Sequence, residues 1–78
     1  MKKSKIQELL NKYRWHPALN PSLLTVVYVD RFKGFSSFKG DEIEGVGRKF
    51  VYLKSGILIP VHRIVEIRYR DDVVWRKF

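Results

Sequence analysis

Near the start of the chain, apolar residues recur with the spacing of one face of an α-helix. Residues 4–14 place them at the i, i+3, i+4 and i+7 positions that share such a face. Ser4 and Gln7 have the spacing of a capping box, in which each side chain accepts a hydrogen bond from the other residue's backbone N–H. Pro17 disfavours helical geometry in the residue before it, so we predict a helix that ends near Trp15. The apolar face consists of Ile6, Leu9, Leu10 and Tyr13.

The rest of the chain favours β-strands. Val, Ile, Thr and Tyr are frequent there, and several runs alternate between apolar and polar residues. Ser55-Gly56 fits a two-residue hairpin turn, and Pro60, which has no backbone N–H to donate, marks the end of a strand or the edge of a sheet. Residues 33–47 are rich in glycine and carry the acidic run DEIE, so we predict a loop there with one short helical turn, or a weak strand at 35–38. The predicted strands cover residues 24–32, 49–54, 56–59, 64–70 and 73–78.

These elements predict one small α+β domain that covers residues 1–78. We expect one N-terminal helix packed on a small antiparallel sheet of four to five strands, either open or curled toward a barrel. A chain of 78 residues buries only about 60% of its unfolded surface, so a deep cavity would remove much of its core. A surface site or a shallow groove is therefore expected.

The composition adds a strong positive charge. Sixteen Lys and Arg stand against eight Asp and Glu, which gives a formal net charge of +8 and a pI of about 10.1. The surplus lies in residues 1–14 and 48–78, whereas residues 15–47 carry more acidic than basic side chains. A charge of this size is typical of proteins that bind nucleic acid, although small proteins also carry it for solubility alone.

Several classes of protein are excluded by what the sequence lacks. Without cysteine there is neither a disulfide framework nor a thiolate zinc site, and two histidines with scattered carboxylates do not form a metal-binding spacing. No apolar run reaches the ~20 residues of a membrane span, and the opening MKK lacks the apolar stretch of a signal peptide. We therefore expect a soluble, cytoplasmic protein without a cofactor or a membrane partner, and a monomer by default.

Residues 59–64, IPVHRI, offer the most specific chemistry in the chain. His62 lies beside Arg63 between two runs with the pattern of strands. An imidazole next to a permanently charged guanidinium suits an anionic, hydrogen-bonding ligand, most obviously a phosphate. This segment is therefore the first candidate for a binding site.

The predicted strand at residues 64–70 carries a basic face. Arg68 and Arg70 lie about 6.6 Å apart on it, close to the spacing of phosphates along a single nucleic-acid strand. Arg76 lies nearby if the C-terminal hairpin pairs as predicted. Alternatively, this face is simply solvated, and Glu66 pairs with a neighbouring arginine.

Exposed aromatic side chains could add stacking to this charge. Aromatic residues on a sheet stack on nucleic-acid bases. The candidates are Tyr28, Tyr52, Tyr69, Trp75 and the aromatic residues around Phe35 and Phe38, and of these Tyr28 and Trp75 are assigned to stacking. A domain of this size needs most of its eleven aromatic residues in the core. Trp15, at the exit of the predicted helix, is expected to fill the core rather than to stack on a ligand.

Catalysis finds little support in the sequence. Two histidines can act as general acid and base on an RNA phosphodiester. Here His16 precedes Pro17, nothing brings it toward His62, and neither histidine lies in a His-x-Thr or His-x-Ser motif. There is no Ser-His-Asp order, phosphate-binding glycine loop or paired-carboxylate motif either. We predict a protein without enzymatic activity.

Four short segments, spread along nearly the whole chain, carry a family resemblance. They are Arg14-Trp15-x-Pro17, Tyr28-x-Asp30-Arg31, Pro60-x-His62-Arg63-Ile64 and Val74-Trp75-Arg76. In this order they resemble the RNA cyclic group end recognition domain, a family of small, mostly archaeal proteins that is also found fused to RNA-processing modules. The resemblance implies a non-enzymatic domain that recognises processed RNA ends, such as a 2′,3′-cyclic phosphate. Some relatives carry histidine in place of Asp30, and an acid there repels a phosphate unless Arg31 neutralises it.

The sequence therefore predicts a module that binds RNA ends. In this hypothesis His62, Arg63 and Arg31 hold the terminal phosphate. Two alternatives stay open: a protein-interaction or accessory domain of an RNA-processing complex, and an RNA-end-processing enzyme that uses His62 with Arg63. The residues expected to hold the adjacent backbone are Arg68, Arg70 and Arg76, and those expected to stack on bases are Tyr28 and Trp75.

Overall fold

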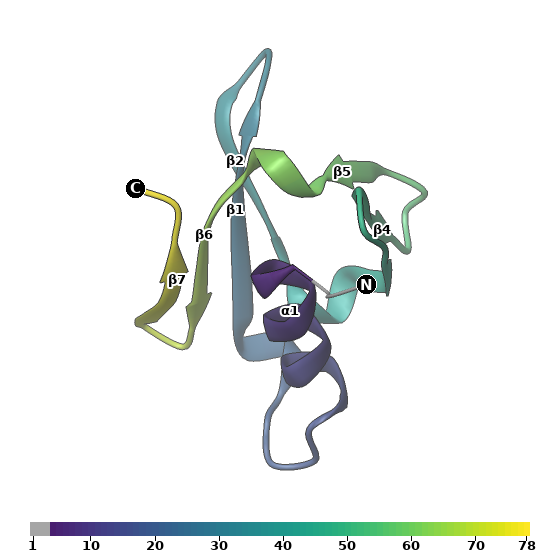
Figure 1. The fold of residues 1–78 in the computed structure, drawn as a ribbon, viewed down its shortest axis with the longest axis vertical. Helices are drawn as coiled ribbons and strands as arrows, with labels where there is room; N and C mark the ends of the chain where they lie inside the picture. Colours follow the sequence, from purple (N-terminus) through teal and green to yellow (C-terminus); the bar gives the residue numbers. More distant parts are fainter. Residues whose placement is uncertain (1–3) are drawn as a thin grey trace.

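The computed structural model describes residues 4–78, which form one α-helix, three short 3-10 helices and seven strands (Figure 1). The helices are α1 Lys5–Trp15, η1 Pro21–Leu23, η2 Gly40–Glu42 and η3 Val61–Arg63. The strands are β1 Leu24–Asp30, β2 Gly34–Lys39, β3 Ile43–Val46, β4 Phe50–Leu53, β5 Leu58–Pro60, β6 Ile64–Tyr69 and β7 Asp72–Arg76.

The strands form two antiparallel sheets. The larger has the order β2-β1-β6-β7 and the smaller the order β3-β4-β5. The chain passes from the larger sheet to the smaller through η2 and returns through η3. The predicted α+β class is confirmed, and the larger sheet has the expected four strands. In the described part of the chain a second, smaller sheet stands beside it, and neither sheet closes into a barrel.

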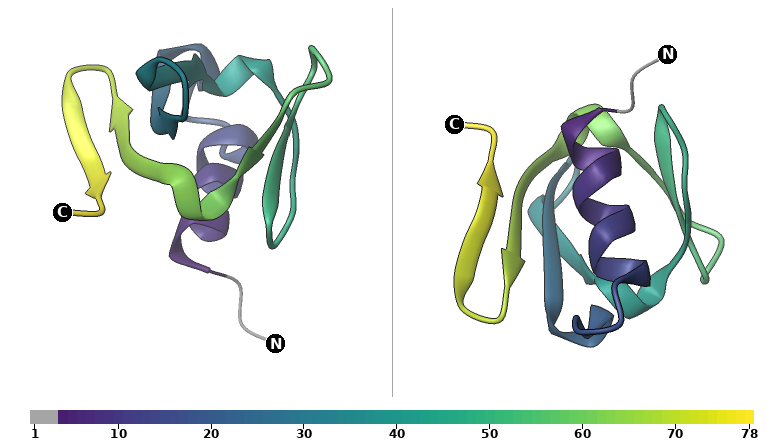
Figure 2. Two further views of the ribbon diagram at one scale, coloured as in Figure 1. Left: turned by 90° about the horizontal axis from the view of Figure 1, so that it is seen from above. Right: turned by 60° about the horizontal axis from the view of Figure 1, so that its bottom comes forward.

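The hydrophobic core lies between the two sheets, where α1 fills the space (Figure 2). Leu10 of α1 is fully buried, and the ring of Tyr13 packs against that of Tyr69 on β6 with 4.8 Å between the ring centroids. Both sheets contribute aliphatic side chains to the same cluster. Burial of this apolar surface is the main term that stabilises a fold of this size. The larger sheet supplies Leu24, Val26, Phe38, Ile64 and Ile67, and the smaller supplies Ile43, Val51, Leu53 and Ile59.

The predicted helix is confirmed, including both of its ends. The Ser4 hydroxyl accepts a hydrogen bond from the Gln7 backbone N–H at 3.1 Å, and the Gln7 side chain accepts one from the Ser4 N–H at 3.0 Å. The helix ends at Trp15, because His16 adopts the extended conformation that Pro17 imposes on the residue before it. Among the residues described, no helix has the length and apolar character needed to cross a bilayer.

The predicted loop at residues 33–47 is the segment whose structure differs most from the prediction. These residues contain β2, the short helix η2 and β3. The weak strand expected at 35–38 is a full edge strand, since β2 pairs with β1 from Thr25 opposite Lys39 to Asp30 opposite Gly34. Its sequence, GFSSFK, has little strand propensity of its own, so the pairing and the burial of Phe38 decide its conformation.

The expectation for Trp15 is wrong. Its side chain is 71% exposed, and the Arg14 guanidinium carbon lies 4.7 Å from the centroid of its ring. Trp15 follows buried Tyr13 by two residues, which is about 200° around a helix of 3.6 residues per turn. It therefore points away from the core.

Candidate nucleic-acid interface

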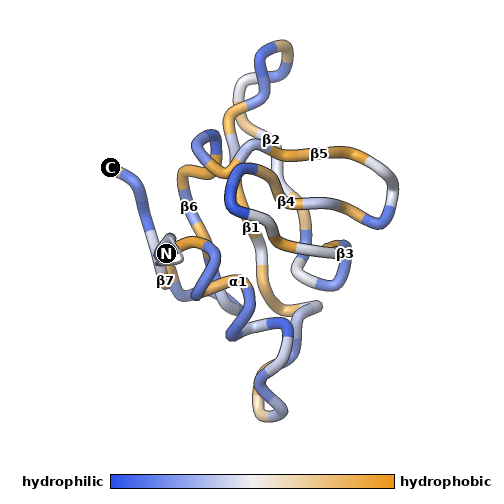
Figure 3. Tube along the Cα trace, turned by 45° about the vertical axis from the view of Figure 1, so that its right-hand side comes forward, coloured by the Kyte–Doolittle hydropathy of each residue, from blue (hydrophilic) through white to orange (hydrophobic). Residues whose placement is uncertain are grey.

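Two hairpins from different sheets form an open groove of about 320 Å³, here called the hairpin groove. Residues 28–33, around the turn between β1 and β2, form one wall. Residues 57–60, at the end of the β4–β5 hairpin, form the other, and Arg63 of η3 completes the lining. Figure 3 shows hydrophilic chain around a hydrophobic position at the first hairpin tip, and hydrophobic chain along β5.

Three cations converge on the hairpin groove. Arg31 and Lys33 come from the exposed turn after β1, and Arg63 comes from η3, more than two dozen residues later. Asp30 is the single acidic side chain among the lining residues, so the groove carries a positive surplus. Guanidinium groups bind phosphate oxygens with paired, charge-assisted hydrogen bonds. The structure thus brings together two of the three residues that the sequence assigns to the terminal phosphate.

Asp30 shapes the tip of the first hairpin. Its Oδ1 accepts hydrogen bonds from the backbone N–H groups of Phe32 at 2.8 Å and Lys33 at 3.2 Å. The bond from Phe32 is the main influence that lowers the pKa of Asp30. Partial burial opposes it, and the Lys33 N–H together with the charges of Lys33 and Arg63 lowers the pKa further. The lowered pKa keeps Asp30 ionised at neutral pH, and its two hydrogen bonds shape the turn that contains Arg31.

The hairpin groove also has an apolar side. Phe32, at the tip of the turn, is 94% exposed, and Ile57 and Leu58 on the opposite wall are about half exposed. Tyr28 is half-buried, and its ring packs against Phe38 of β2 with 6.0 Å between the centroids. A groove with apolar walls and a cationic rim fits a ligand that has both a flat ring and a phosphate.

His62 lies outside the hairpin groove. It lines a separate groove of about 370 Å³, here called the histidine groove, together with Arg48, Lys49, Trp75 and Lys77. In a 3-10 helix successive side chains diverge by about 120°, because there are three residues per turn. His62 and Arg63, neighbours in η3, therefore face different grooves.

A third groove adjoins the histidine groove. Its lining residues are Arg48, Lys49, Phe50 and Tyr52, and it is here called the tyrosine groove. Tyr52, one of the stacking candidates, lines this groove, and Trp75 lines the adjoining histidine groove, whereas Tyr28 lines the hairpin groove. The basic residues of the β3–β4 turn were not among the residues predicted from the sequence. The signal for them was the pair Arg48-Lys49 at the start of the basic C-terminal half.

The arginine on the basic face of β6 forms an ion pair within the sheet. Glu66 accepts a hydrogen bond from the guanidinium of Arg68 on its own strand and one, at 3.0 Å, from that of Arg76 on β7. This is the ion pairing that the sequence left open as the alternative. Both arginines therefore use one of their guanidinium donors within the sheet. Their contact with an RNA backbone stays a prediction.

These ion pairs also set the protonation of Glu66. Partial burial raises its pKa, but the hydrogen bonds and charges of Arg68 and Arg76 outweigh that effect, so the pKa lies below its ordinary value of 4.5. A carboxylate whose pKa is lowered in the folded protein stabilises the folded state at pH values above the ordinary pKa of that group. That contribution is lost as the pH falls through the lower, folded-state pKa.

Arg70 does not share the face of Arg68. β6 ends at Tyr69, and Arg70 lies in the turn to β7 with a φ of +57°. Few residues other than glycine adopt this left-handed conformation. The backbone N–H of Arg70 donates to the carbonyl oxygen of Leu23 at 3.0 Å. The predicted row of arginines along one strand therefore ends at Arg68.

The two histidines lie too far apart to act on one bond. His16 caps the end of α1, where its Nδ1 accepts a hydrogen bond from the Ala18 backbone N–H at 3.1 Å. Ile6, near the other end of α1, lines the histidine groove with His62. At 1.5 Å per residue, the helix separates these two ends by about 15 Å. Within residues 4–78, no group of three His, Asp or Glu side chains is arranged to hold a metal ion.

Nearly the whole chain matches one protein family. A family model described as the MJ1316 RNA cyclic group end recognition domain covers residues 1–77. The chain belongs to the RNA cyclic group end recognition domain family. All three grooves lie within the part of the chain that matches this family.

Relatives of this RNA cyclic group end recognition domain come from archaea and carry the name UPF0248 protein. The one from Archaeoglobus fulgidus is 52% identical over 68 residues, which cover 87% of this chain and 99% of the relative. That from Metallosphaera sedula is 35% identical, with 92% and 91% covered, and that from Methanocaldococcus jannaschii is 30% identical, with 92% of each covered. No solved structure matches the chain.

Proposed function

We propose that this protein binds RNA and recognises processed RNA ends, with a terminal phosphate such as a 2′,3′-cyclic phosphate held in the hairpin groove. The observation that carries the proposal is the convergence of Arg31, from the turn between β1 and β2, and Arg63, from η3, on one open groove. A 2′,3′-cyclic phosphate is a phosphodiester that keeps one negative charge and two exposed oxygens, which suit guanidinium donors. The description of the family as an RNA end recognition domain agrees with this assignment.

The apolar walls of the hairpin groove complete the proposed site. With the phosphate against Arg31 and Arg63, the ribose and base of the last nucleotide lie against the Phe32 side of the groove. Stacking on an aromatic ring depends little on base identity, because every base has a π-face. In this proposal the protein recognises the chemistry of the RNA end and not the base sequence of the RNA.

The proposed function is binding without catalysis. Cleavage or opening of a phosphodiester by general acid–base chemistry needs two groups within hydrogen-bond reach of the reacting atoms. Arg31 and Arg63 are permanent cations that stabilise a bound anion, and Asp30 uses Oδ1 in the hairpin turn. The site thus has the groups needed to hold a phosphate and no proton-transfer pair.

Binding of three RNAs that differ only at the 3′ end tests this function. Fluorescence anisotropy with one labelled oligonucleotide ending in a 2′,3′-cyclic phosphate, a 3′-phosphate or a free hydroxyl gives three dissociation constants. We expect the cyclic phosphate to bind at least about tenfold tighter than the hydroxyl, because two charged hydrogen bonds are gained. Equal constants for all three ends would contradict end recognition and leave general RNA binding.

Replacing Asp30 with asparagine is expected to strengthen binding of the phosphate end about two- to fivefold. Asparagine keeps an oxygen that accepts from the Phe32 and Lys33 N–H groups, so the turn is retained. The substitution removes a negative charge beside Arg31 and Arg63. Repulsion from residue 30 then no longer reduces the attraction of these two arginines for the phosphate. Asp30→Ala, which removes both the charge and the acceptor, is the control, measured by the same anisotropy titration. Weaker binding by both variants would show that Asp30 contributes to binding rather than opposing it.

A further inference from the structure

The histidine and tyrosine grooves form one continuous surface. Both are lined by Arg48 and Lys49 of the β3–β4 turn. The histidine groove adds His62, Trp75 and Lys77, and the tyrosine groove adds aromatic side chains from β4. We call the combined surface the basic aromatic surface. Its polar and aromatic members are Arg48, Lys49, Phe50, Tyr52, His62, Trp75 and Lys77.

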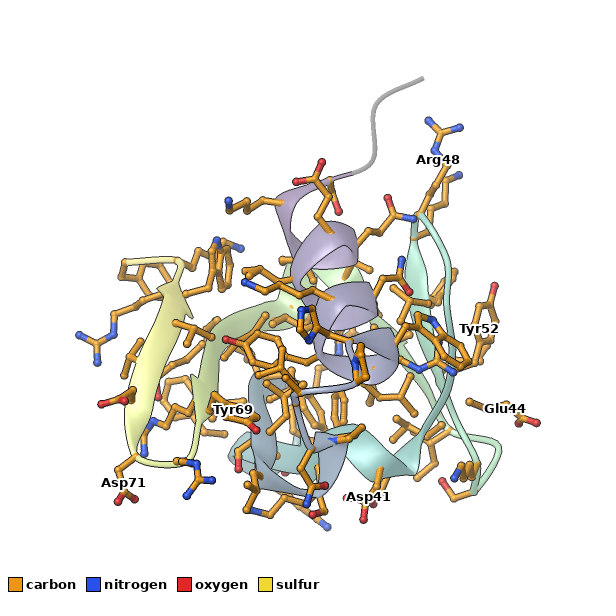
Figure 4. The ribbon with its side chains drawn as sticks, turned by 90° about the horizontal axis from the view of Figure 1, so that it is seen from below. Asp41, Glu44, Arg48, Tyr52, Tyr69 and Asp71 are labelled. Carbon is orange, nitrogen blue, oxygen red and sulfur yellow. The ribbon has the colours of Figure 1, made fainter. Side chains whose placement is uncertain are left out.

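The charge of the basic aromatic surface has a single sign. Arg48, Lys49 and Lys77 are cations, and no acidic residue lines either of its grooves in the described chain. The hairpin groove, by contrast, contains Asp30. Figure 4 shows Arg48 at the tip of the β3–β4 turn and Tyr52 on the outer side of β4, with Glu44 below Tyr52 and with Asp41 and Asp71 at the end of the view farthest from Arg48. The surface therefore attracts anions around Arg48, Lys49 and Lys77.

Hydrogen bonds join the three chain segments that build the histidine groove. The Lys77 ammonium donates to the His62 carbonyl oxygen at 2.9 Å, and the Val61 backbone N–H donates to the Lys49 carbonyl oxygen at 2.8 Å. A third bond, from the Lys77 N–H to the Val65 carbonyl oxygen at 2.9 Å, fixes the C-terminal segment against β6. The bond to His62 uses one of the three ammonium donors of Lys77. The cations are thus held on a defined framework.

Aromatic rings and cations line the same two grooves of this surface. Trp75 is half-buried in the histidine groove, and Tyr52 is 43% exposed in the tyrosine groove. Cations that follow a phosphate backbone, interleaved with aromatic faces that take bases, are the combination by which proteins bind single-stranded nucleic acid. An acidic peptide would use the cations but would leave the aromatic faces without a planar partner.

The basic aromatic surface and the hairpin groove meet at η3. Pro60 and Arg63 line the hairpin groove, while Val61 and His62, between them in the chain, line the histidine groove. A strand whose 3′ end lies in the hairpin groove can therefore cross η3 and continue over the basic aromatic surface. The distance to be crossed is that of one short helix.

We propose that the basic aromatic surface binds single-stranded RNA on the 5′ side of the terminal nucleotide, so that the protein holds several nucleotides and not the end alone. This inference rests on the proposed function for its direction, since the end in the hairpin groove decides which part of the strand reaches the surface. Lys49 and Lys77 neutralise backbone phosphates, and Trp75 and Tyr52 stack on bases. The unpaired strand supplies the exposed bases that this requires.

Oligonucleotide length and end chemistry, varied independently, test the proposal. Four labelled oligouridines are used, of two or eight nucleotides, each ending in a 2′,3′-cyclic phosphate or a hydroxyl. With the native protein we expect the longer RNA to bind at least about tenfold tighter at either end. The Lys49→Glu variant is expected to lose most of this length effect and to keep the ratio between the two ends. Its plot of log affinity against log salt concentration is expected to be shallower by about 0.7 or more.

Matched variants separate this proposal from the proposed function. Lys12→Ala removes a charge from α1 outside the three grooves and is expected to change neither ratio. Tyr52→Ala, with no change of charge, is expected to reduce the length effect and leave the salt dependence as it is. A length effect that survives in folded Lys49→Glu would overturn the inference, whatever the end ratio shows. Displacement of the longer RNA by polyglutamate as readily as by polyuridine would also overturn it, in favour of an acidic protein partner.

Discussion

Replacement of Arg31 and Arg63 together with alanine is expected to weaken binding of an RNA with a terminal cyclic phosphate about one hundredfold. Each charged hydrogen bond to the phosphate contributes ~1.5 kcal/mol or more, and every ~1.4 kcal/mol is a factor of ten in affinity. Arg31 comes from the turn after β1 and Arg63 from η3, so neither side chain can take over the position of the other. The measurement is the dissociation constant for the cyclic-phosphate and hydroxyl ends, and their ratio is expected to fall to about one.

The controls for this double variant address charge and folding. Lys5 and Lys12 lie on α1 outside the three grooves, and Lys5→Ala with Lys12→Ala removes the same net charge. Arg63 is half-buried in η3, so circular dichroism must show that each double variant is folded. A folded Arg31/Arg63 variant that still prefers the cyclic phosphate would place end recognition elsewhere on the molecule.

Replacement of Leu10 with alanine is expected to reduce the free energy of unfolding by ~2–5 kcal/mol. Leu10 is fully buried on the face of α1 that lies between the two sheets (Figure 2). Its removal leaves a cavity bounded by both sheets, which the separate sheets cannot readily close. A domain of this size has ~5–15 kcal/mol of stability in total, so the loss is a large part of it.

Thermal and urea unfolding, followed by far-ultraviolet circular dichroism, measure this effect. The expected fall in melting temperature is about 10 °C or more. The neighbouring Leu9 is only half-buried at the edge of the same core, and Leu9→Ala is therefore expected to cost clearly less. Equal losses for the two variants would mean that α1 does not fill the space between the sheets as described.

The elements with strong local signals could be predicted from the sequence. The apolar stripe, the capping box and the proline after α1 fix both ends of the helix within the chain itself. The β4–β5 hairpin follows from Ser55 and Gly56, since Gly56 has the positive φ of +93° that the turn requires. β2 was predicted only as a weak strand and β3 as part of a loop, because pairing with β1 and β4 and the burial of Phe38 and Ile43, rather than local propensity, decide their conformation. The close packing of Gly40 in η2 was not predicted either: a Cβ there would lie 2.5 Å from the Pro21 carbonyl oxygen, a contact that only the folded chain reveals.

The candidate site could be predicted only in part, and the reason is geometric. The residue types were identified, but His62 and Arg63 were assigned to one phosphate because they are neighbours in the chain. Neighbouring side chains point to opposite faces of a strand and diverge by about a third of a turn in a 3-10 helix. The residue that joins Arg63 in the groove is Arg31, from the turn between β1 and β2. The pairing of β1 with β6, in which Tyr28 lies opposite Ile64, brings the two segments together, and no local pattern in the sequence encodes that pairing.

The position of the hairpin groove between the sheets has a mechanical consequence. One wall belongs to β1 and its turn and the other to β5, and the chain links the two sheets only through η2 and η3. A bound RNA end that contacts both walls is then a further, reversible cross-link between the two halves of the molecule. Any fluctuation that parts the sheets must first release it, and ligand that binds only the closed form stabilises that form by mass action. The bound RNA end is therefore expected to hold the two sheets together, so that amide hydrogen exchange slows in β1 and β5 together.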